Sequence, residues 1–173
     1  ARSAAGWGFF FNRDGSHLAY GALAGPGSWV MVVDGVKSPA YRAIDFTQTR
    51  LNGKRLVYVA QTADQQWHAV VDGKPGPPYA AIRELALTPD GLHYAFIGTK
   101  SGVGPQSSTV VNDGVESAMY YGVTNLEQAP DGRIAYVAVT NPGDARGRGA
   151  VGNLYAAGIT APVSRSFNVS TYD

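Results

Sequence analysis

The chain contains no cysteine, so a disulfide framework and a thiolate metal site are both excluded. Charged residues are scarce at 16%, well below the roughly one quarter that is usual in soluble domains. The 14 Lys and Arg nearly balance the 13 Asp and Glu, and no basic stripe of the kind that binds nucleic acid is present. No apolar run approaches the roughly 18 residues that a membrane-spanning helix needs. The sequence therefore predicts that the protein has no nucleic-acid partner and no membrane-spanning helix.

Common catalytic motifs are missing as well. The chain has no Gly-x-Ser-x-Gly elbow and no His-Glu-x-x-His motif, so it lacks the residues of these hydrolase and zinc-protease active sites. A Gly-x-Gly-x-x-Gly match at 147–152 falls in a predicted loop between strands, with no helix to bind a pyrophosphate. His17 and His93 occupy the same position in a repeat and are interpreted as exposed strand starts. The sequence therefore predicts no catalytic residue, no metal and no cofactor.

What the chain does contain is a repeat of about 40 residues. A turn followed by a short apolar strand recurs four times, and the aromatic residues that end the copies are 38, 38 and 40 residues apart: Tyr20, Tyr58, Phe96 and Tyr136. A second marker, Asp-Gly followed by a tyrosine seven residues after the aspartate, keeps the same phase over three copies: Asp34 with Tyr41, Asp72 with Tyr79, and Asp113 with Tyr120. Such a period is typical of radial or linear repeat proteins.

Each unit divides into four short strands, which in the third unit are expected over 85–87, 93–97, 109–111 and 119–123. The fold class is therefore all-β, and the pattern predicts a β-propeller of about four four-stranded antiparallel blades. The blades are expected roughly over 9–45, 46–84, 85–125 and 126–165, with an extra strand over 166–173. The whole of 1–173 is then one propeller domain, a part of a larger propeller, or a half-ring completed by a second copy. A closed ring of four blades is the second choice.

The turns Pro89-Asp90-Gly91 and Pro130-Asp131-Gly132, each followed by a strand ending in an aromatic residue, resemble the Pro-Asp-Gly propeller repeats of the WD40-like type. Such repeats occur in the periplasmic propeller protein of the Tol system and in the propellers of prolyl-oligopeptidase-type peptidases. The resemblance covers nearly the whole chain. It implies a propeller and a periplasmic or extracellular location in a bacterial envelope. It implies little about function, because one fold hosts many activities.

Two groups of residues are candidates for partner binding. Trp29 and Trp67 start equivalent strands beside loops, where they would line a recognition face. The loop over 140–149 is long and carries the densest polar cluster of the chain: Asn141, Asp144, Arg146 and Arg148. Long loops on a rigid scaffold are a usual place for recognition. The repeated aspartates, in contrast, are interpreted as turn residues, and the repeated tyrosines as packing between blades.

These observations favour a non-catalytic binding module that presents its loops to a protein, peptide or glycan. The alternative is an accessory propeller that filters substrates for a serine peptidase of the prolyl-oligopeptidase type, whose catalytic domain lies outside this sequence. A standalone enzyme working at the channel mouth is a third class, disfavoured by the missing motifs. A second copy of the chain, or the remainder of a larger chain, is also a candidate partner.

Overall fold

The structure is a computed structural model that describes residues 8–143, 149–156 and 159–163, the last of these as backbone only. These residues form strands and turns and no helix, which confirms the prediction of an all-β chain built from four four-stranded antiparallel sheets. The first sheet contains β1 (Phe9–Phe11), β2 (Leu18–Gly25), β3 (Ser28–Val33) and β4 (Val36–Lys37). The second contains β5 (Ala43–Asn52), β6 (Arg55–Gln61), β7 (Trp67–Val71) and β8 (Lys74–Pro75). The third contains β9 (Ala81–Leu87), β10 (Tyr94–Thr99), β11 (Ser108–Asn112) and β12 (Val115–Glu116). The fourth contains β13 (Gly122–Gln128), β14 (Ile134–Asn141), β15 (Val151–Ala156) and β16 (Ile159–Val163).

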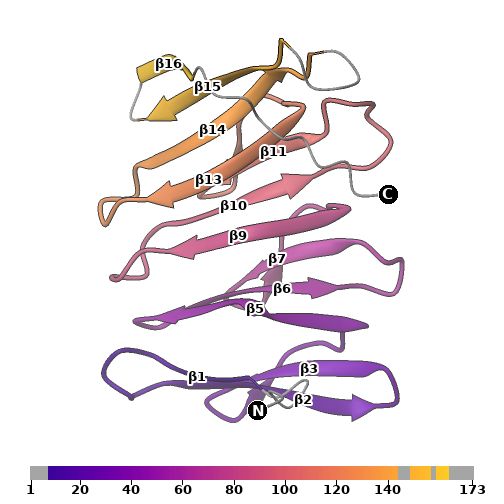
Figure 1. Ribbon diagram of the computed structural model, residues 1–173. Helices are drawn as coiled ribbons and strands as arrows, with labels where there is room; N and C mark the ends of the chain where they lie inside the picture. Colours follow the sequence, from indigo (N-terminus) through magenta and orange to yellow (C-terminus); the bar gives the residue numbers. More distant parts are fainter. Residues whose placement is uncertain (1–7, 144–148, 157–158, 164–173) are drawn as a thin grey trace, which may run out of the picture.

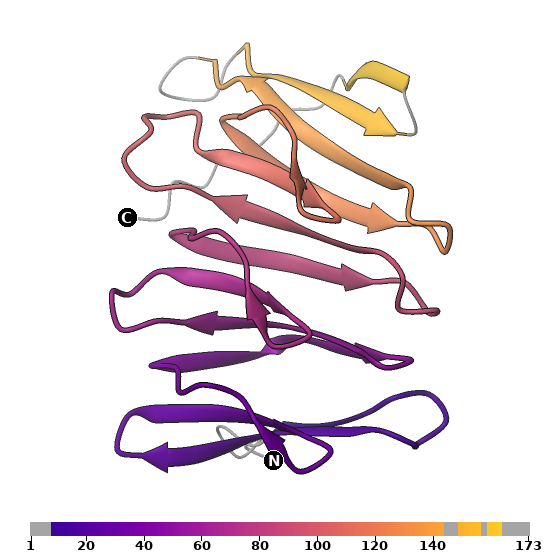
Figure 2. The same cartoon turned by 180° about the vertical axis from the view of Figure 1, so that it is seen from behind.

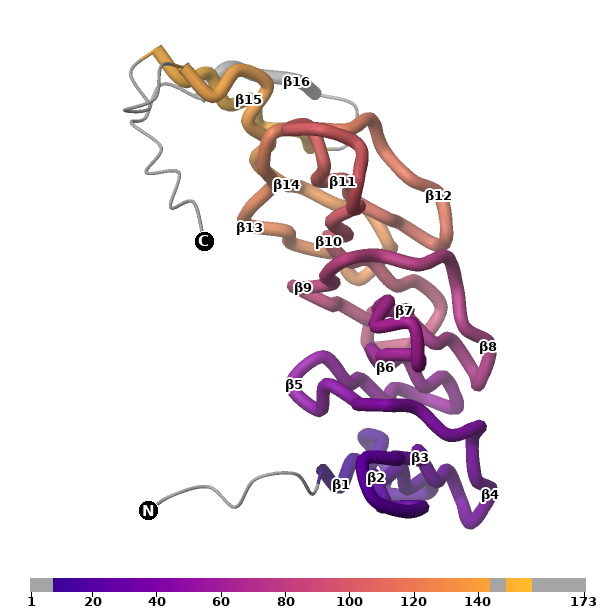
Figure 3. The backbone as a smooth tube through the Cα atoms, turned by 90° about the vertical axis from the view of Figure 1, so that its right-hand side faces the viewer, coloured from indigo at the N-terminus to yellow at the C-terminus, as the bar shows by residue number. Residues whose placement is uncertain are grey.

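The four sheets lie in one row that follows the sequence order, as both faces of the molecule show (Figures 1 and 2). In Figure 3 the first strands β1, β5, β9 and β13 lie along one side of the row, and β4, β8 and β12 lie along the other. Consecutive first strands contact one another. The first and fourth sheets lie at opposite ends (Figure 1), so the described part of the chain shows no closed ring of four sheets.

Apolar clusters fill the space between successive sheets. Between the first and second sheets, Ala19 and Met31 pack against Leu56 and Tyr58, and the next two junctions are built from equivalent residues. At each junction a tyrosine of one sheet meets the repeat aromatic of the next, with ring centroids 5.5 to 6.1 Å apart: Tyr41 with Tyr58, Tyr79 with Phe96, and Tyr120 with Tyr136. The prediction that these rings pack between sheets is confirmed.

Both kinds of Asp-Gly pair form turns, as predicted. At the β3–β4, β7–β8 and β11–β12 turns the aspartate and the glycine both have positive φ, which is the type I′ geometry of two-residue hairpins: Asp34-Gly35, Asp72-Gly73 and Asp113-Gly114. In the other set the aspartate Oδ1 accepts the backbone N–H two residues ahead, at 2.9 to 3.2 Å: Asp14 from Ser16, Asp90 from Leu92, and Asp131 from Arg133.

The fourth strand of the third unit was predicted wrongly. It was expected over 119–123, but β12 follows the turn at once as Val115–Glu116. A type I′ turn pairs the residues on its two sides directly, so the strand begins immediately after it. Tyr120 makes only an isolated bridge with Ser108, and Gly122 and Val123 already belong to β13. The second, third and fourth sheets accordingly begin at residues 43, 81 and 122, three or four residues before the expected blade starts. The extra strand expected over 166–173 lies outside the described residues.

In the second and third sheets, the first strand contains a bulge that contacts the next sheet. The pairing of β5, β9 and β13 with their neighbours shifts register at this point. Gln48 Oε1 of the second sheet accepts the backbone N–H of Leu85 at 2.7 Å. Glu84 Oε2 of the third sheet accepts that of Leu126 at 2.8 Å in the same way. These bonds fix each first strand relative to its successor.

Candidate functional site

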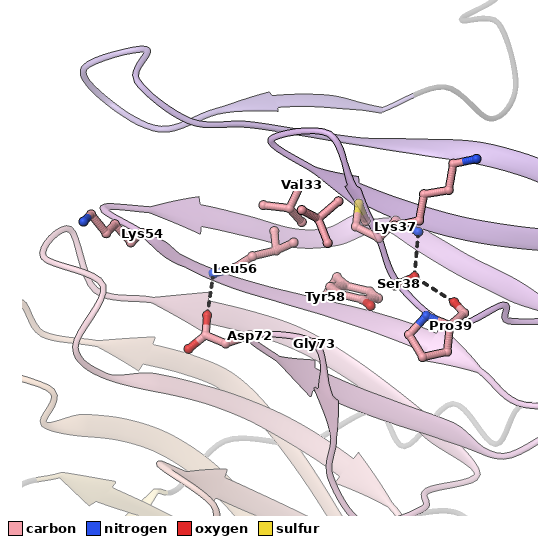
Figure 4. A pocket seen from close by; sticks show the side chains of 11 residues that line it. Val33, Lys37, Ser38, Pro39, Lys54, Leu56, Tyr58, Asp72 and Gly73 are labelled. Carbon is pink, nitrogen blue, oxygen red and sulfur yellow. Dashed lines mark hydrogen bonds between the residues drawn. The ribbon is translucent and has the colours of Figure 1, made fainter.

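A groove of about 440 Å³ opens between the first and second sheets, and we call it the first groove. Figure 4 shows it from close by, with side chains from β3, β4, β6 and the β7–β8 turn around it. Its lining is mainly apolar: Met31, Val33, Val36, Pro39, Leu56 and Tyr58. The chain after β4 forms one wall, where the Ser38 hydroxyl accepts the N–H of Met31 at 2.9 Å and donates to the carbonyl of Pro39 at 2.7 Å. The groove therefore has a fixed apolar wall.

Tyr58 brings a hydroxyl to this apolar lining. The oxygen is buried and makes no hydrogen bond of normal geometry with a described residue, and the same holds for the neighbouring Tyr41. Burial, and after it the Tyr41 hydroxyl, raises the pKa of Tyr58 well above its ordinary value of 10.0, so the phenol stays protonated. The groove is therefore lined by a phenol ring whose protonated hydroxyl lies beneath the surface, near the hydroxyls of Tyr41 and Ser38.

Two lysines stand at the rim of the first groove. Lys37 ends β4 and Lys54 lies in the β5–β6 turn, and both are exposed. Neither forms an ion pair with another residue that the structure describes. The third charged residue of the lining, Asp72, is held by the N–H of Leu56 at 3.0 Å and by Arg55 Nε at 3.3 Å. The rim therefore offers two unpaired positive charges and one compensated negative charge.

The junction between the second and third sheets has a smaller groove at the equivalent place, with a volume of about 220 Å³. Tyr94 stands there where the first groove has Leu56, and Phe96 stands where it has Tyr58. The larger ring of Tyr94 occupies space that Leu56 leaves open. The first groove is therefore a widened version of a feature that the repeat itself creates.

An ion pair recurs next to these grooves. In three sheets the turn aspartate binds the basic residue at or directly before the start of the second strand: Asp34 with His17 at 2.6 Å, Asp72 with Arg55 at 3.3 Å, and Asp113 with His93 at 2.7 Å. The same carboxylate accepts the N–H of the next residue of that strand. For Asp34 the N–H of Leu18 and then the ring of His17 hold the pKa below its ordinary value of 3.8. The two histidines thus directly precede their strands and pair with turn aspartates, with 26% of the His17 side chain and 38% of the His93 side chain exposed.

The two predicted tryptophans do not line the first groove. Trp29 packs against the cluster between the first and second sheets, with its ring 5.6 Å from that of Phe46, and Trp67 packs against the next cluster. Their backbones form bridges with Tyr41 and Tyr79. Both side chains are half-buried, so a recognition role for them stays a prediction that competes with a packing role.

The predicted polar loop is described only in part. Asn141 ends β14, is exposed, and its Oδ1 accepts the N–H of Gly143 at 2.9 Å. Asp144, Arg146 and Arg148 lie outside the described residues. Within the part that the structure describes, no group of three His, Cys, Asp or Glu side chains is arranged to hold a metal ion. No described segment is a helix long and apolar enough to cross a membrane.

Sequence reasoning missed the residues that make the first groove, namely Lys37, Lys54, Leu56 and Tyr58. A signal was present, because these positions vary between units that otherwise keep one pattern. The third unit has Leu92 and Tyr94 where the second has Lys54 and Leu56. A position that differs between otherwise equivalent units is one at which the fold does not require a particular residue.

Comparison of the chain with protein-family models, with curated proteins and with solved structures finds no match.

Proposed function

We propose that the four sheets are blades of a β-propeller and that the chain is a non-catalytic binding module for a protein or peptide. Four equivalent antiparallel sheets in sequence order support the propeller, as does the position of their first strands along one side of the row (Figure 3). Rigid sheets joined by three apolar clusters suit a scaffold that holds a binding surface in place.

The observation that carries the binding proposal is the first groove. Its mainly apolar lining takes an aliphatic or aromatic side chain, and the lysines at its rim attract a carboxylate. A peptide segment with an apolar residue next to Asp or Glu supplies both groups from one short stretch. A glycan would need more polar partners than this lining offers, so a peptide is the better ligand of the two.

The repeat itself suggests how to test this proposal. Leu56→Tyr copies the residue that stands at the equivalent position of the third sheet, so it fills the first groove with a side chain that the fold accepts elsewhere. We expect it to weaken binding of apolar-acidic peptides, selected from a peptide array, by at least about tenfold. Val115→Tyr, at an exposed position of β12, is the control and should bind like the unchanged protein.

The rim is tested separately. Lys37→Gln together with Lys54→Gln should weaken binding several-fold and flatten its dependence on salt, because exposed charges act through a screened field. Peptides that bind equally well to the Leu56→Tyr variant would contradict the first groove as the site and leave the loop over 140–149 as the candidate. The envelope location and the accessory role beside a peptidase stay predictions.

A further inference from the structure

Each sheet has two faces, and the three junctions show which residues belong to each. The preceding face packs on the sheet before it and carries the repeat aromatic, such as Tyr58 or Phe96. The following face packs on the sheet after it and carries small or aliphatic residues, such as Ala95 and Val110 of the third sheet, together with the tyrosine that comes after the fourth strand, here Tyr120. The two faces are complementary, since the chain joins them three times.

The first sheet exposes its preceding face. Phe11 is 63% exposed, whereas Leu51, its equivalent in the second sheet, is 6% exposed within a junction. Phe9 is 66% exposed and lies against Tyr20, with ring centroids 5.8 Å apart. Tyr20 is the repeat aromatic of this sheet, and its equivalents in the other three sheets are buried. An aromatic face built like the buried ones therefore has no sheet upon it within the described residues.

At the other end of the row the following face of the fourth sheet is open only in part, because Val139 on that face is 7% exposed. Leu154 is 37% exposed and Val137 is half-buried, and they pair across β14 and β15. Their equivalents in the third sheet, Val110 and Ile97, pair in the same way and are buried against the fourth sheet. Asn125 also shares its strand position and positive φ with Glu84, which bonds to the next sheet, but the Asn125 side chain is exposed.

We propose that two copies of the chain associate head to tail, the following face of one fourth sheet packing on the preceding face of the other first sheet. Both junctions then close, and eight sheets form one ring. The occupant is a second copy because the chain carries both halves of an interface that it already makes three times. In each new junction Asn125 takes the place that Glu84 has inside the chain. This association depends on the end faces and not on the first groove.

The first measurement is the mass in solution by light scattering over a concentration series reaching well above micromolar. We expect a dimer of twice the 18.2 kDa chain mass. A chain that stays monomeric throughout would overturn the proposal, and so would open assemblies that grow beyond two copies.

Two variants then test the head-to-tail arrangement. Phe11→Arg blocks the preceding face and Leu154→Arg blocks the following face, both at exposed positions. Each junction needs one preceding face and one following face. A protein that carries only one of the two variants should therefore be monomeric. An equimolar mixture should recover dimers, because the Phe11→Arg chain still has its following face and the Leu154→Arg chain its preceding face. If only one variant dissociates the dimer, or neither does, the faces pair differently and the proposal fails.

Two controls separate this proposal from others. Unchanged circular dichroism and melting of the monomeric variants show that the sheets remain folded. Peptide binding at the first groove should persist in those monomers, so failure of the dimer leaves the binding proposal intact. Loss of peptide binding would likewise leave the dimer proposal intact.

Discussion

Glycines at equivalent turns differ in what surrounds them, and this difference has a measurable consequence. Gly15 and Gly91 have nearly the same φ, +73° and +74°. A Cβ at Gly15 meets nothing within 4 Å, whereas one at Gly91 would lie 2.5 Å from the carbonyl oxygen of Asn52 in the neighbouring sheet. The turn at Gly91 is therefore also a contact between sheets.

We expect Gly15→Ala to lower the free energy of unfolding by about 1 kcal/mol, the cost of a left-handed non-glycine residue. Gly91→Ala should cost clearly more, because the Asn52 backbone must also move. Urea unfolding of the two variants side by side measures the difference. If both variants lose the same free energy of unfolding, the backbone of Asn52 moves away from the added Cβ without a cost in stability.

Gln128 is a polar residue at an apolar position. Its side-chain nitrogen and oxygen are both buried without a hydrogen-bond partner among the described residues. The equivalent residues of the second and third sheets are Leu51 and Leu87. An unsatisfied buried polar group costs on the order of 1–3 kcal/mol.

Gln128→Leu is therefore expected to stabilise the fold, raising the free energy of unfolding by about 1 kcal/mol. Thermal and urea unfolding measure it. Glu127→Leu is the matched control at the adjacent exposed position and should change stability by less than about 0.5 kcal/mol. A loss of stability in Gln128→Leu would mean that the amide makes a stabilising hydrogen bond in solution.

At the scale of the element, the type I′ hairpin at Asp34-Gly35 is tied to the second strand by a carboxylate. Asp34 bonds to the N–H of Leu18 and to His17, and these contacts hold its pKa below 3.8 in the folded state. A depressed folded pKa means that the ionised carboxylate stabilises the fold above the unfolded pKa, and that this contribution disappears as pH falls through the folded value.

Asp34→Asn keeps a residue that tolerates positive φ but loses the charge. We expect the unchanged protein to melt at a higher temperature than the variant near neutral pH. The gap should close as pH falls below 3.8, where the unchanged carboxyl becomes protonated too. Melting curves at several pH values measure this gap. A gap that stays constant into strong acid would show that the charge of Asp34 is not the cause.

Much of the element pattern was predictable from the sequence, because turn residues and strand alternation are local signals. The Asp-Gly turns and the repeat aromatics were placed correctly for this reason. The fourth strand of the third unit was placed wrongly, since β12 is two residues long and the isolated bridge at Tyr120 resembles a strand end. A two-residue strand leaves no periodicity to detect.

The candidate site was less predictable than the fold. The first groove exists because Leu56 of one sheet faces the outer strands of another, and this facing depends on how the sheets stack. Stacking is a property of distant segments and leaves no local pattern. The bulge contacts of Gln48 and Glu84 could not be predicted for the same reason.

At the scale of the whole molecule, the row resembles other repeat arrays in which each unit contacts only its neighbours. Stability in such arrays is approximately a sum of unit and junction contributions. The fourth sheet is held by the third through one apolar cluster and through bonds at the bulge, where Glu84 accepts the N–H of Leu126 and Arg83 donates to the carbonyl of Val123 at 2.7 Å. Weakening one junction should therefore loosen the sheet beyond it without disturbing the far end.

Glu84→Ala removes the carboxylate that accepts the Leu126 N–H, a bond to a charged group worth about 1.5–3 kcal/mol when buried and less at this half-buried site. We expect the amides of β13 and β14 to exchange with solvent several-fold faster, while those of β2 and β6 keep their rates. Hydrogen exchange read by mass spectrometry resolves the sheets separately. Glu127→Ala, an exposed carboxylate on β13, is the control and should leave every rate unchanged. Faster exchange across all four sheets would instead mean that they unfold as one cooperative unit, and the junctions would then not be separable.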